Sequence, residues 1–266
     1  MPRQITAFSN PLVKQVRSLR DKKHRRTSGL FMAEGLRILT EAREGGMLPH
    51  ILFFGSGKGH PLLDILIAET EAAGGEAIET SSDILQKITG KDNPQIVVGA
   101  YPAFDTRIES IDRSAADLWI VAQALRDPGN LGTILRTGDA VGAGGLILID
   151  DCVDPFSVEA VRASMGALFT QKLAVAPWHE FLRWLRSADA ELIGTSLNTE
   201  CDYQSHSYGK PCFLLVGNEA QGLSAEHEAA CDMLVKVPMR GKADSLNAAV
   251  ATAVVAYEIT NQRRKA

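Results

Sequence analysis

Cysteine is scarce in this chain of 266 residues and follows no disulfide or metal-binding pattern. The four copies form no C-x-x-C pair and have no histidine at ligand spacing; they are Cys152, Cys201, Cys212 and Cys231. We therefore expect free thiols in the reducing cytoplasm, with neither a disulfide framework nor a bound metal.

Long apolar runs are also absent. No stretch approaches the roughly 20 apolar residues that cross a bilayer. The opening MPRQITAFSN lacks the apolar run that follows the basic residue of a signal peptide. We expect a globular protein with no membrane partner.

Two common enzyme signatures are missing. The chain has no G-x-S-x-G nucleophile elbow. The segment GAGG at 142–145 follows a predicted helix and precedes a predicted strand, which reverses the order of a dinucleotide fingerprint, and Ile147 stands where the third glycine belongs. Both absences argue against a serine hydrolase and against a Rossmann-type oxidoreductase.

Positive charge, in contrast, is concentrated at the start of the chain. The formal net charge is −4, yet residues 1–30 carry eight Lys and Arg residues against one acid, Asp21. Such asymmetry is typical of a basic arm or face that meets phosphate. The alternative is a solvated helix face with no partner.

The pattern of apolar residues divides the chain in two. Residues 1–102 alternate short helices and strands, with helices expected over 10–26 and 31–46, and form a small α/β domain. A polar linker is expected over 103–116, and a regular strand–helix alternation fills 117–266. That alternation predicts a mostly parallel sheet covered by helices on both faces, with ligands beyond the carboxyl ends of the strands.

Three loops are expected at those strand ends. In the first, Asn130 can cap a helix over 131–142 that also carries Arg136. In the second, Gly217 follows a buried strand and Glu219 comes two residues later. In the third, a strand ending near Met239 leads to a long helix from Ser245, which can cap it and leave its positive end facing the site.

The three patterns N-x-G-x-x-x-R, G-x-E-x-x-G and P-M-x-G-x-x-x-S-L-N occur in this order. Together they resemble the SpoU (TrmH-type) RNA 2′-O-ribose methyltransferases of the SPOUT superfamily, from about residue 117 to the end. The segment NPLVKQVRSLRDKKHRRTSGLFMAEG resembles the substrate-binding domain that many members carry. This chain departs from the family at Ala248-Ala249, where Val-Ser is common, and at Val237, where Ile is frequent.

The resemblance implies a SPOUT-type parallel-sheet domain with a deep trefoil knot and a homodimer formed through the C-terminal domain. It also implies an S-adenosyl-methionine pocket. Its residues would be Thr195, Gly217, Val237, Met239 and Leu246. The implied catalytic residues are Asn130, Arg136, Glu219, Ser245 and Asn247.

The reaction implied is methyl transfer to a ribose hydroxyl, which requires removal of the hydroxyl proton. No His or Cys stands in the three motifs, so the usual general base is missing. Arg136 is the family's proposed base, but a guanidinium with a pKa above about 12 stays protonated. We therefore expect Arg136 to bind the neighbouring phosphate and polarise the hydroxyl, while Asn130, Glu219, Ser245 and Asn247 position ribose and loops.

The sequence thus predicts an RNA 2′-O-methyltransferase, with rRNA ahead of tRNA as the substrate. The alternative from another class is a non-catalytic RNA-binding or assembly factor on the same fold. Intact Asn130, Arg136, Glu219 and Asn247 argue against it, because a binding module has no need for all four.

Overall fold

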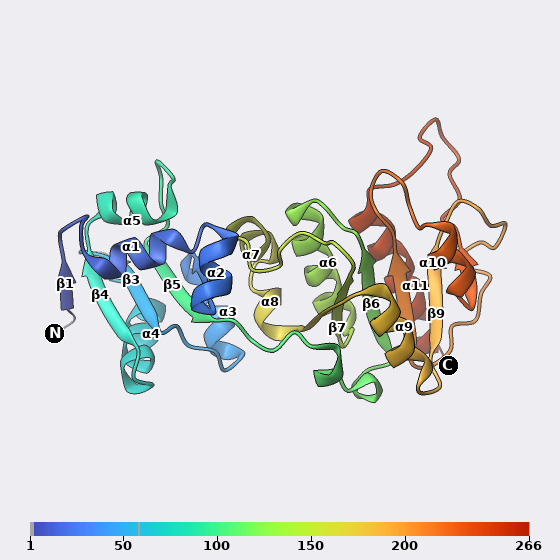
Figure 1. Cartoon of the computed structure of the whole chain (residues 1–266), viewed down its shortest axis with the longest axis horizontal. Coiled ribbons are helices and arrows are strands. Elements are labelled where there is room, and N and C mark those ends of the chain that lie inside the picture. The colour runs from blue at the N-terminus through green and yellow to red at the C-terminus, as the bar shows by residue number, and fades with distance from the viewer. Residues whose placement is uncertain (1–2, 58, 266) are drawn as a thin grey trace. The chain divides into compact units, whose positions relative to one another are not determined.

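The computed structural model describes residues 3–57 and 59–265, which fold into two compact units (Figure 1). The first unit contains the residues up to Phe104 together with Asp154–Thr170. The second contains Asp105–Val153 and the chain from Gln171 onward. Within the described residues, no helix has the length and apolar character needed to span a membrane.

The first unit is built on a five-stranded sheet. Its strands, in spatial order, are β1 (Arg3–Ile5), β4 (Glu76–Thr80), β3 (Ile51–Gly55), β5 (Val97–Pro102) and β2 (Leu30–Glu34). The first three run parallel, and β5 is antiparallel to both β3 and β2. Its helices are α1 (Pro11–Ser18), α2 (Lys22–Ser28), α3 (Leu36–Glu44), α4 (Pro61–Ala72), α5 (Ser82–Thr89), α7 (Val158–Ser164) and α8 (Ala167–Thr170).

Two helix predictions in this unit are wrong in their extent. The helix expected over 10–26 is interrupted, because α1 ends at Ser18 and the side chain of Asp21 starts α2 by accepting a hydrogen bond from the Lys23 amide. The helix expected over 31–46 begins with a strand instead. Leu30–Glu34 fills the sheet edge beside β5, and Gly35, at φ +99°, turns the chain into α3.

The second unit is built on a six-stranded sheet in which all paired strands are parallel. The spatial order is β11 (Met233–Val235), β9 (Glu191–Thr195), β10 (Cys212–Val216), β6 (Leu118–Gln123), β7 (Gly145–Ile149) and β8 (Lys172–Ala176). Its helices are α6 (Pro128–Val141), α9 (Trp178–Arg186), α10 (Ala225–Ala230) and α11 (Ala248–Lys265), and two short 3₁₀ helices cover Ile108–Ser110 and Arg113–Ala115. The expected α/β fold with a parallel sheet is confirmed.

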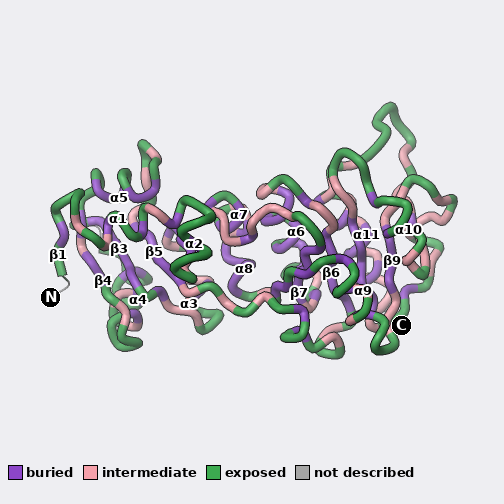
Figure 2. Tube along the Cα trace, viewed as in Figure 1, coloured by how far each residue is buried: buried purple, intermediate pink, exposed green. Residues whose placement is uncertain are grey.

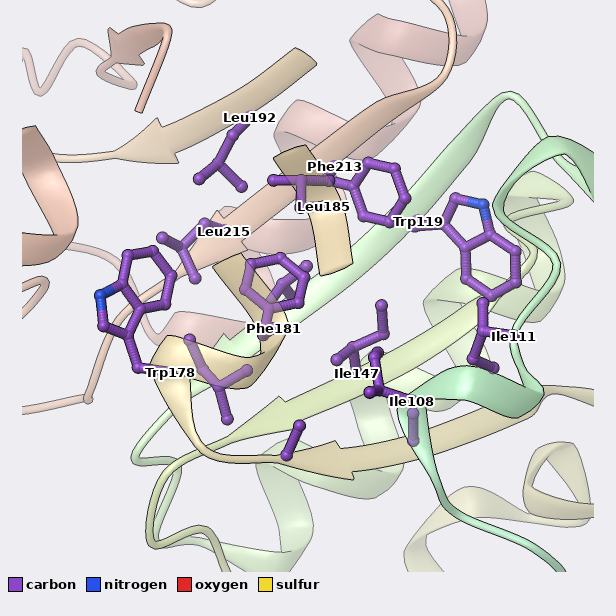
Figure 3. Close-up of a cluster of buried hydrophobic side chains, with 14 of the residues drawn as sticks. Ile108, Ile111, Trp119, Ile147, Trp178, Phe181, Leu185, Leu192, Phe213 and Leu215 are labelled. Atoms are coloured by element: carbon purple, nitrogen blue, oxygen red, sulfur yellow. The ribbon is translucent and has the colours of Figure 1, made fainter. Parts of the chain in front are cut away.

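The central strands of this sheet are buried on both faces (Figure 2). On one face, Trp119 stacks on Phe213 from the neighbouring strand, and Phe181 of α9 packs into the same apolar cluster (Figure 3). On the other face α6 and α11 pack together, and Ile120 lies against Gly138 of α6. Near-continuous apolar strands are what a doubly covered parallel sheet requires. The loops at the strand ends therefore project from a rigid core.

The segment Asp154–Thr170 differs from the expected division of the chain. The sequence placed everything after residue 116 in one domain, yet this segment packs within the first unit. Phe156 and Phe169 lie 4.9 and 5.8 Å from Phe31, measured between ring centroids. The buried Arg25 guanidinium donates to Asp154 Oδ2 at 2.6 Å. These contacts join residues far apart in sequence, so local pattern did not reveal them.

Candidate active site

The carboxyl ends of β9, β10 and β11 and the start of α11 surround a cavity of about 340 Å³. The crevice beyond the strand ends is the usual ligand position in a parallel sheet. Seven of the ten predicted site residues line the cavity: Thr195, Gly217, Glu219, Val237, Met239, Ser245 and Leu246. The other three, Asn130, Arg136 and Asn247, lie outside its lining.

The loop after β10 forms one wall of the cavity. A Cβ atom at Gly217 would lie 2.3 Å from the carbonyl carbon of Gly222, so only glycine fits where the loop folds back on itself. Asn218 holds the turn, since its Oδ1 accepts from the amides of Ala220 and Gln221. Its Nδ2 donates to the carbonyl of Ala124 at 2.9 Å, which ties the loop after β10 to the loop after β6.

Asn218 was not among the predicted site residues. The available signal was an asparagine directly after the glycine at a strand end, where its side chain can hydrogen-bond the backbone two residues on. The link to Ala124 had no local signal, because it depends on which strands are neighbours in the sheet.

Glu219 binds the same neighbouring loop through its carboxylate. Oε1 accepts from Asn130 Nδ2 at 3.0 Å and from the Asp127 amide at 3.3 Å, and Oε2 accepts from the Arg126 amide at 3.4 Å. Partial burial raises the pKa of the Glu219 carboxyl, but these hydrogen bonds outweigh that effect and hold the pKa below its usual range. Glu219 is therefore a carboxylate at neutral pH and a poor proton acceptor.

Asn130 connects Glu219 to the last helix. Its side chain is buried, at 6% exposure, and while Nδ2 donates to Glu219, Oδ1 accepts from Asn247 Nδ2 at 2.8 Å. Residues from the first turn of α6, the loop after β10 and the start of α11 thus form one hydrogen-bonded chain. The sequence brought these motifs together only through the strand-end argument and the family resemblance; the structure joins them directly.

Two predicted helix caps are wrong. The cap of α6 is Asp127, whose Oδ1 accepts from the Gly129 amide at 2.8 Å, and Pro128 occupies the first helical position. This places Asn130 inside the first turn and frees its side chain for Glu219. The α11 amides of Ala249 and Val250 donate to Asn247 Oδ1.

Ser245 therefore does not cap α11. The helix starts at Ala248, three residues later than expected, because Asn247 supplies the capping oxygen. The Ser245 side chain is exposed and lines the cavity.

Arg136 lies apart from the other predicted residues. It is exposed on α6, six residues after Asn130, and its side chain makes no hydrogen bond or ion pair with any residue of 3–57 or 59–265. The expectation that the helix start would place Arg136 in the mouth of the cavity finds no support in the cavity lining. Its guanidinium is free to bind a group from outside the chain.

A second polar wall was not predicted. Glu228 of α10 accepts hydrogen bonds from Ser196 Oγ and from Asn198 Nδ2, the latter at 3.1 Å, and all three line the cavity. Among the described lining residues there is no His or Cys. Nor do the described residues contain a group of acidic, His and Cys side chains able to hold a metal.

Comparison with known proteins places these features in context. Residues 117–257 match the SpoU rRNA Methylase family, and residues 10–99 match the MRM3-like substrate binding domain. The chain is 33% identical over 268 residues to an uncharacterized tRNA/rRNA methyltransferase of Synechocystis, covering 97% of this chain and 94% of that relative. It is 31% identical over 271 residues to the 23S rRNA (uridine(2479)-2′-O)-methyltransferase of Streptomyces viridochromogenes, covering 98% and 93%.

Solved structures give the same picture. The fold matches that of an AdoMet-bound rRNA methyltransferase from Sinorhizobium meliloti with a TM-score of 0.90 and 38% identity, covering 99% of this chain and 98% of that chain.

Proposed function

The chain belongs to the SpoU rRNA methylase family, and from this premise we propose that it methylates a ribose 2′-hydroxyl of ribosomal RNA with S-adenosyl-methionine as the donor. The observation that carries the proposal is the hydrogen-bonded chain Glu219–Asn130–Asn247. It gathers the three family motifs at one cavity, where a donor and a hydroxyl can meet.

The cavity suits the methyl donor. Its volume of about 340 Å³ falls in the range of small-molecule sites. Its walls combine apolar side chains, among them Val237, Met239 and Leu246, with the polar group of Ser196, Asn198 and Glu228. A ligand with a flat nucleoside base and a charged amino-acid end needs both kinds of wall.

In the proposal, the donor is held by Thr195, Gly217, Val237, Met239 and Leu246, all of which line the cavity. When bound, it supplies an electrophilic methyl group. The residues of this chain then need to align the ribose hydroxyl and favour loss of its proton.

Asn130, Glu219 and Asn247 serve by fixing the loops around the cavity, and Ser245 offers an exposed hydroxyl to the substrate. Arg136 binds the phosphate beside the target ribose and polarises the hydroxyl, because its guanidinium stays protonated and has no partner among the described residues. The RNA phosphate next to the target ribose must therefore lie close to α6, the helix that carries Arg136.

The RNA partner is supported by the surface of α1 and α2. Five of their basic side chains, and Arg20 in the turn between them, are exposed and form no ion pair with a described residue; the five are Lys14, Arg17, Lys22, Lys23 and Arg26. Clustered unpaired cations attract the phosphate backbone. The substrate-binding match over residues 10–99 and the rRNA-modifying relatives favour rRNA over tRNA.

The proposal includes three further features that family membership supports. The second unit forms a deep trefoil knot, and two chains form a homodimer through this unit. Val250 and Tyr257 on α11, which are 48% and 55% exposed, offer apolar surface for that interface. The site of action is the cytoplasm, which agrees with four free cysteines.

The test is methyl transfer from labelled S-adenosyl-methionine to rRNA taken from cells that lack this protein. We expect label in one 2′-O-methylnucleoside of the large-subunit rRNA, identified by mass spectrometry, and none in tRNA. Label in tRNA alone would show that tRNA, not rRNA, is the substrate. Binding of rRNA without any transfer, together with no calorimetric binding of the donor, would favour the non-catalytic assembly factor.

A further inference from the structure

Phe8 is an unusual side chain in the first unit. It lies in the turn between β1 and α1 and is 52% exposed. Among the Phe, Tyr and Trp residues described in this unit it is the one in the exposed class. A single exposed apolar residue needs no explanation by itself, so its surroundings decide its meaning.

Those surroundings are a shallow basic hollow between α1 and α5. Phe8 lines it together with Arg17, Arg20, Lys87 and four further residues, Asp83, Gln86, Gly90 and Asp92. An adjoining hollow shares the two arginines and adds Lys14, Ser18, Asp21 and His24. The two arginines therefore stand at the junction of both, and the phenyl ring lines the first hollow.

The four cations of these hollows are available to a ligand. The side chains of Lys14, Arg17, Arg20 and Lys87 form no hydrogen bond or ion pair with any part of the chain that the structure describes. Some exposed arginines outside the hollows are paired instead. Those at positions 3, 107 and 126 are each paired with a carboxylate.

The acids of the hollows are partly engaged. The carboxylate of Asp21 accepts from the Lys23 amide, and that of Asp92 accepts from the side-chain amide of Gln86. Both carboxylates therefore use part of their hydrogen-bonding capacity within the chain.

Arg20 is also held in place. A Cβ atom at Gly90 would lie 2.2 Å from Arg20 Nη1, so the guanidinium rests directly on the glycine that ends α5. The carboxyl end of a helix carries partial negative charge, which favours a cation there. Arg20 therefore presents a positioned guanidinium to the hollow.

We infer that this hollow binds an unpaired nucleotide of the substrate RNA, with its base stacked on Phe8 and its flanking phosphates bound by Arg17 and Arg20. The inference rests on the proposed function for the identity of the ligand as RNA. Stacking on an exposed aromatic ring requires a base whose face is free, and bases within a duplex have no free face. A protein partner would call for a wider apolar surface than one ring among four cations.

The site gives the first unit a role in choosing the substrate. A basic face alone attracts any phosphate backbone, whereas an aromatic ring beside it favours single-stranded segments such as loops and bulges. The target would be a nucleotide near an unpaired element of the rRNA.

The experiment compares the full-length protein with its Phe8→Ala and Phe8→Trp variants. Affinities for a short uridine-rich single strand and for a duplex of equal length are measured by fluorescence anisotropy at one salt concentration. We expect F8A to weaken single-strand binding by about 5- to 150-fold, the range for the loss of one stacked base, and F8W to retain it. Duplex binding should change little.

The matched control is Ile65→Ala, which removes another exposed apolar side chain of the same unit, 41% exposed on α4. It should bind both RNAs like the unmodified chain. Equal binding by F8A and the unmodified chain overturns the inference, and so does a loss in F8W as large as in F8A.

Methyl transfer to rRNA separates this inference from the proposed function. If the unmodified chain transfers methyl groups, and F8A matches it in RNA affinity and in KM for RNA, the proposed function is supported and the nucleotide site at Phe8 is overturned. If single-strand binding depends on Phe8 but the unmodified chain transfers no methyl group, the nucleotide site is supported and the proposed methylase function is overturned.

Discussion

Asn247 Nδ2 donates a hydrogen bond to Asn130 Oδ1 over 2.8 Å, although 117 positions separate the two residues in the chain. Through this bond, the cap of α11 is joined to the first turn of α6, and through Asn130 to the Glu219 carboxylate. The same asparagine that starts the last helix thus fixes its position relative to the cavity.

Replacing Asn130 with Ala breaks both bonds of this chain. We expect the free energy of unfolding to fall by about 1–3 kcal/mol, the cost of leaving polar groups without partners. Methyl transfer should fall as the loops loosen. Urea unfolding and initial rates measure the two effects. Thr133→Ala, which removes an exposed hydroxyl bonded to Gly129 on the same helix, is the matched control.

The Asn130–Asn247 bond can be isolated by a double-mutant cycle. The single change Asn247→Ala should cost about 0.5–2 kcal/mol because it also removes the α11 cap. The double variant should lose less unfolding free energy than the sum of the two single losses, by about 0.5 kcal/mol or more, since the two residues are in contact. Strict additivity would show that the bond contributes nothing.

Glu219 should make stability depend on pH. Its pKa is held below the usual range in the folded chain, so its contribution is full above the unfolded value of about 4.5 and is lost as pH falls through the folded value. We expect Glu219→Gln to be less stable than the unmodified chain at pH 7, by less than about 1 kcal/mol because the carboxylate is largely exposed. The difference should shrink below pH 4.5. A gap in unfolding free energy that widens on acidification would contradict this assignment.

The sequence predicted the gathering of the three loops better than the details of their contacts. Alternating strands and helices imply a parallel sheet, and its carboxyl ends meet at one edge, so Gly217 and Met239 were expected to share a cavity, as they do. Both cap predictions failed because more than one polar residue stands near the start of each helix. Asp127 and Asn130, or Ser245 and Asn247, are equally suitable by residue type, and only backbone geometry decides.

The N-terminal charge pattern also misled at one position. Arg25 belongs to the same basic run as its neighbours in the sequence, yet it is buried at 7% exposure and paired with Asp154. Its partner lies 129 positions away in a segment that the pattern assigned to the other domain. Periodicity reports which residues share a helix face; it carries no information on which distant segment covers that face.

Arg136→Ala tests the role of the exposed arginine on α6. We expect methyl transfer to fall by about 10²- to 10³-fold, the range for removing one group that stabilises developing charge. Affinity for S-adenosyl-methionine should be nearly unchanged, because Arg136 does not line the cavity. Calorimetry and single-turnover rates separate the two. A loss of donor binding as large as the loss of rate would make Arg136 a structural residue.

The exposed cations of α2 should govern the salt dependence of RNA binding. Replacing Lys22, Lys23 and Arg26 together with Ala should weaken binding and reduce the slope of log affinity against log salt by up to about 2, because each phosphate that a cation neutralises adds about 0.7 to that slope. The control removes three cations of the second unit that are already paired, Arg107, Lys210 and Lys236. An unchanged slope in the α2 variant would show that these cations are a solvated helix face that does not bind RNA.

The buried pair Arg25–Asp154 should affect the stability of the fold and not the salt dependence of RNA binding, unlike the exposed cations of α2. Asp154→Ala leaves a buried guanidinium without its carboxylate, and removing one partner of such a pair costs about 3–5 kcal/mol. Arg25→Ala should cost a similar amount, and also removes the bond from Nη1 to the Leu19 carbonyl. Thermal unfolding of the first unit measures both, with Arg26→Ala as the exposed control. Because Arg25 is buried and paired within the first unit, it should not bind phosphate. The slope of log affinity for RNA against log salt, measured on folded protein, should therefore stay constant in D154A. A changed slope with unaltered stability would instead make Arg25 a phosphate ligand.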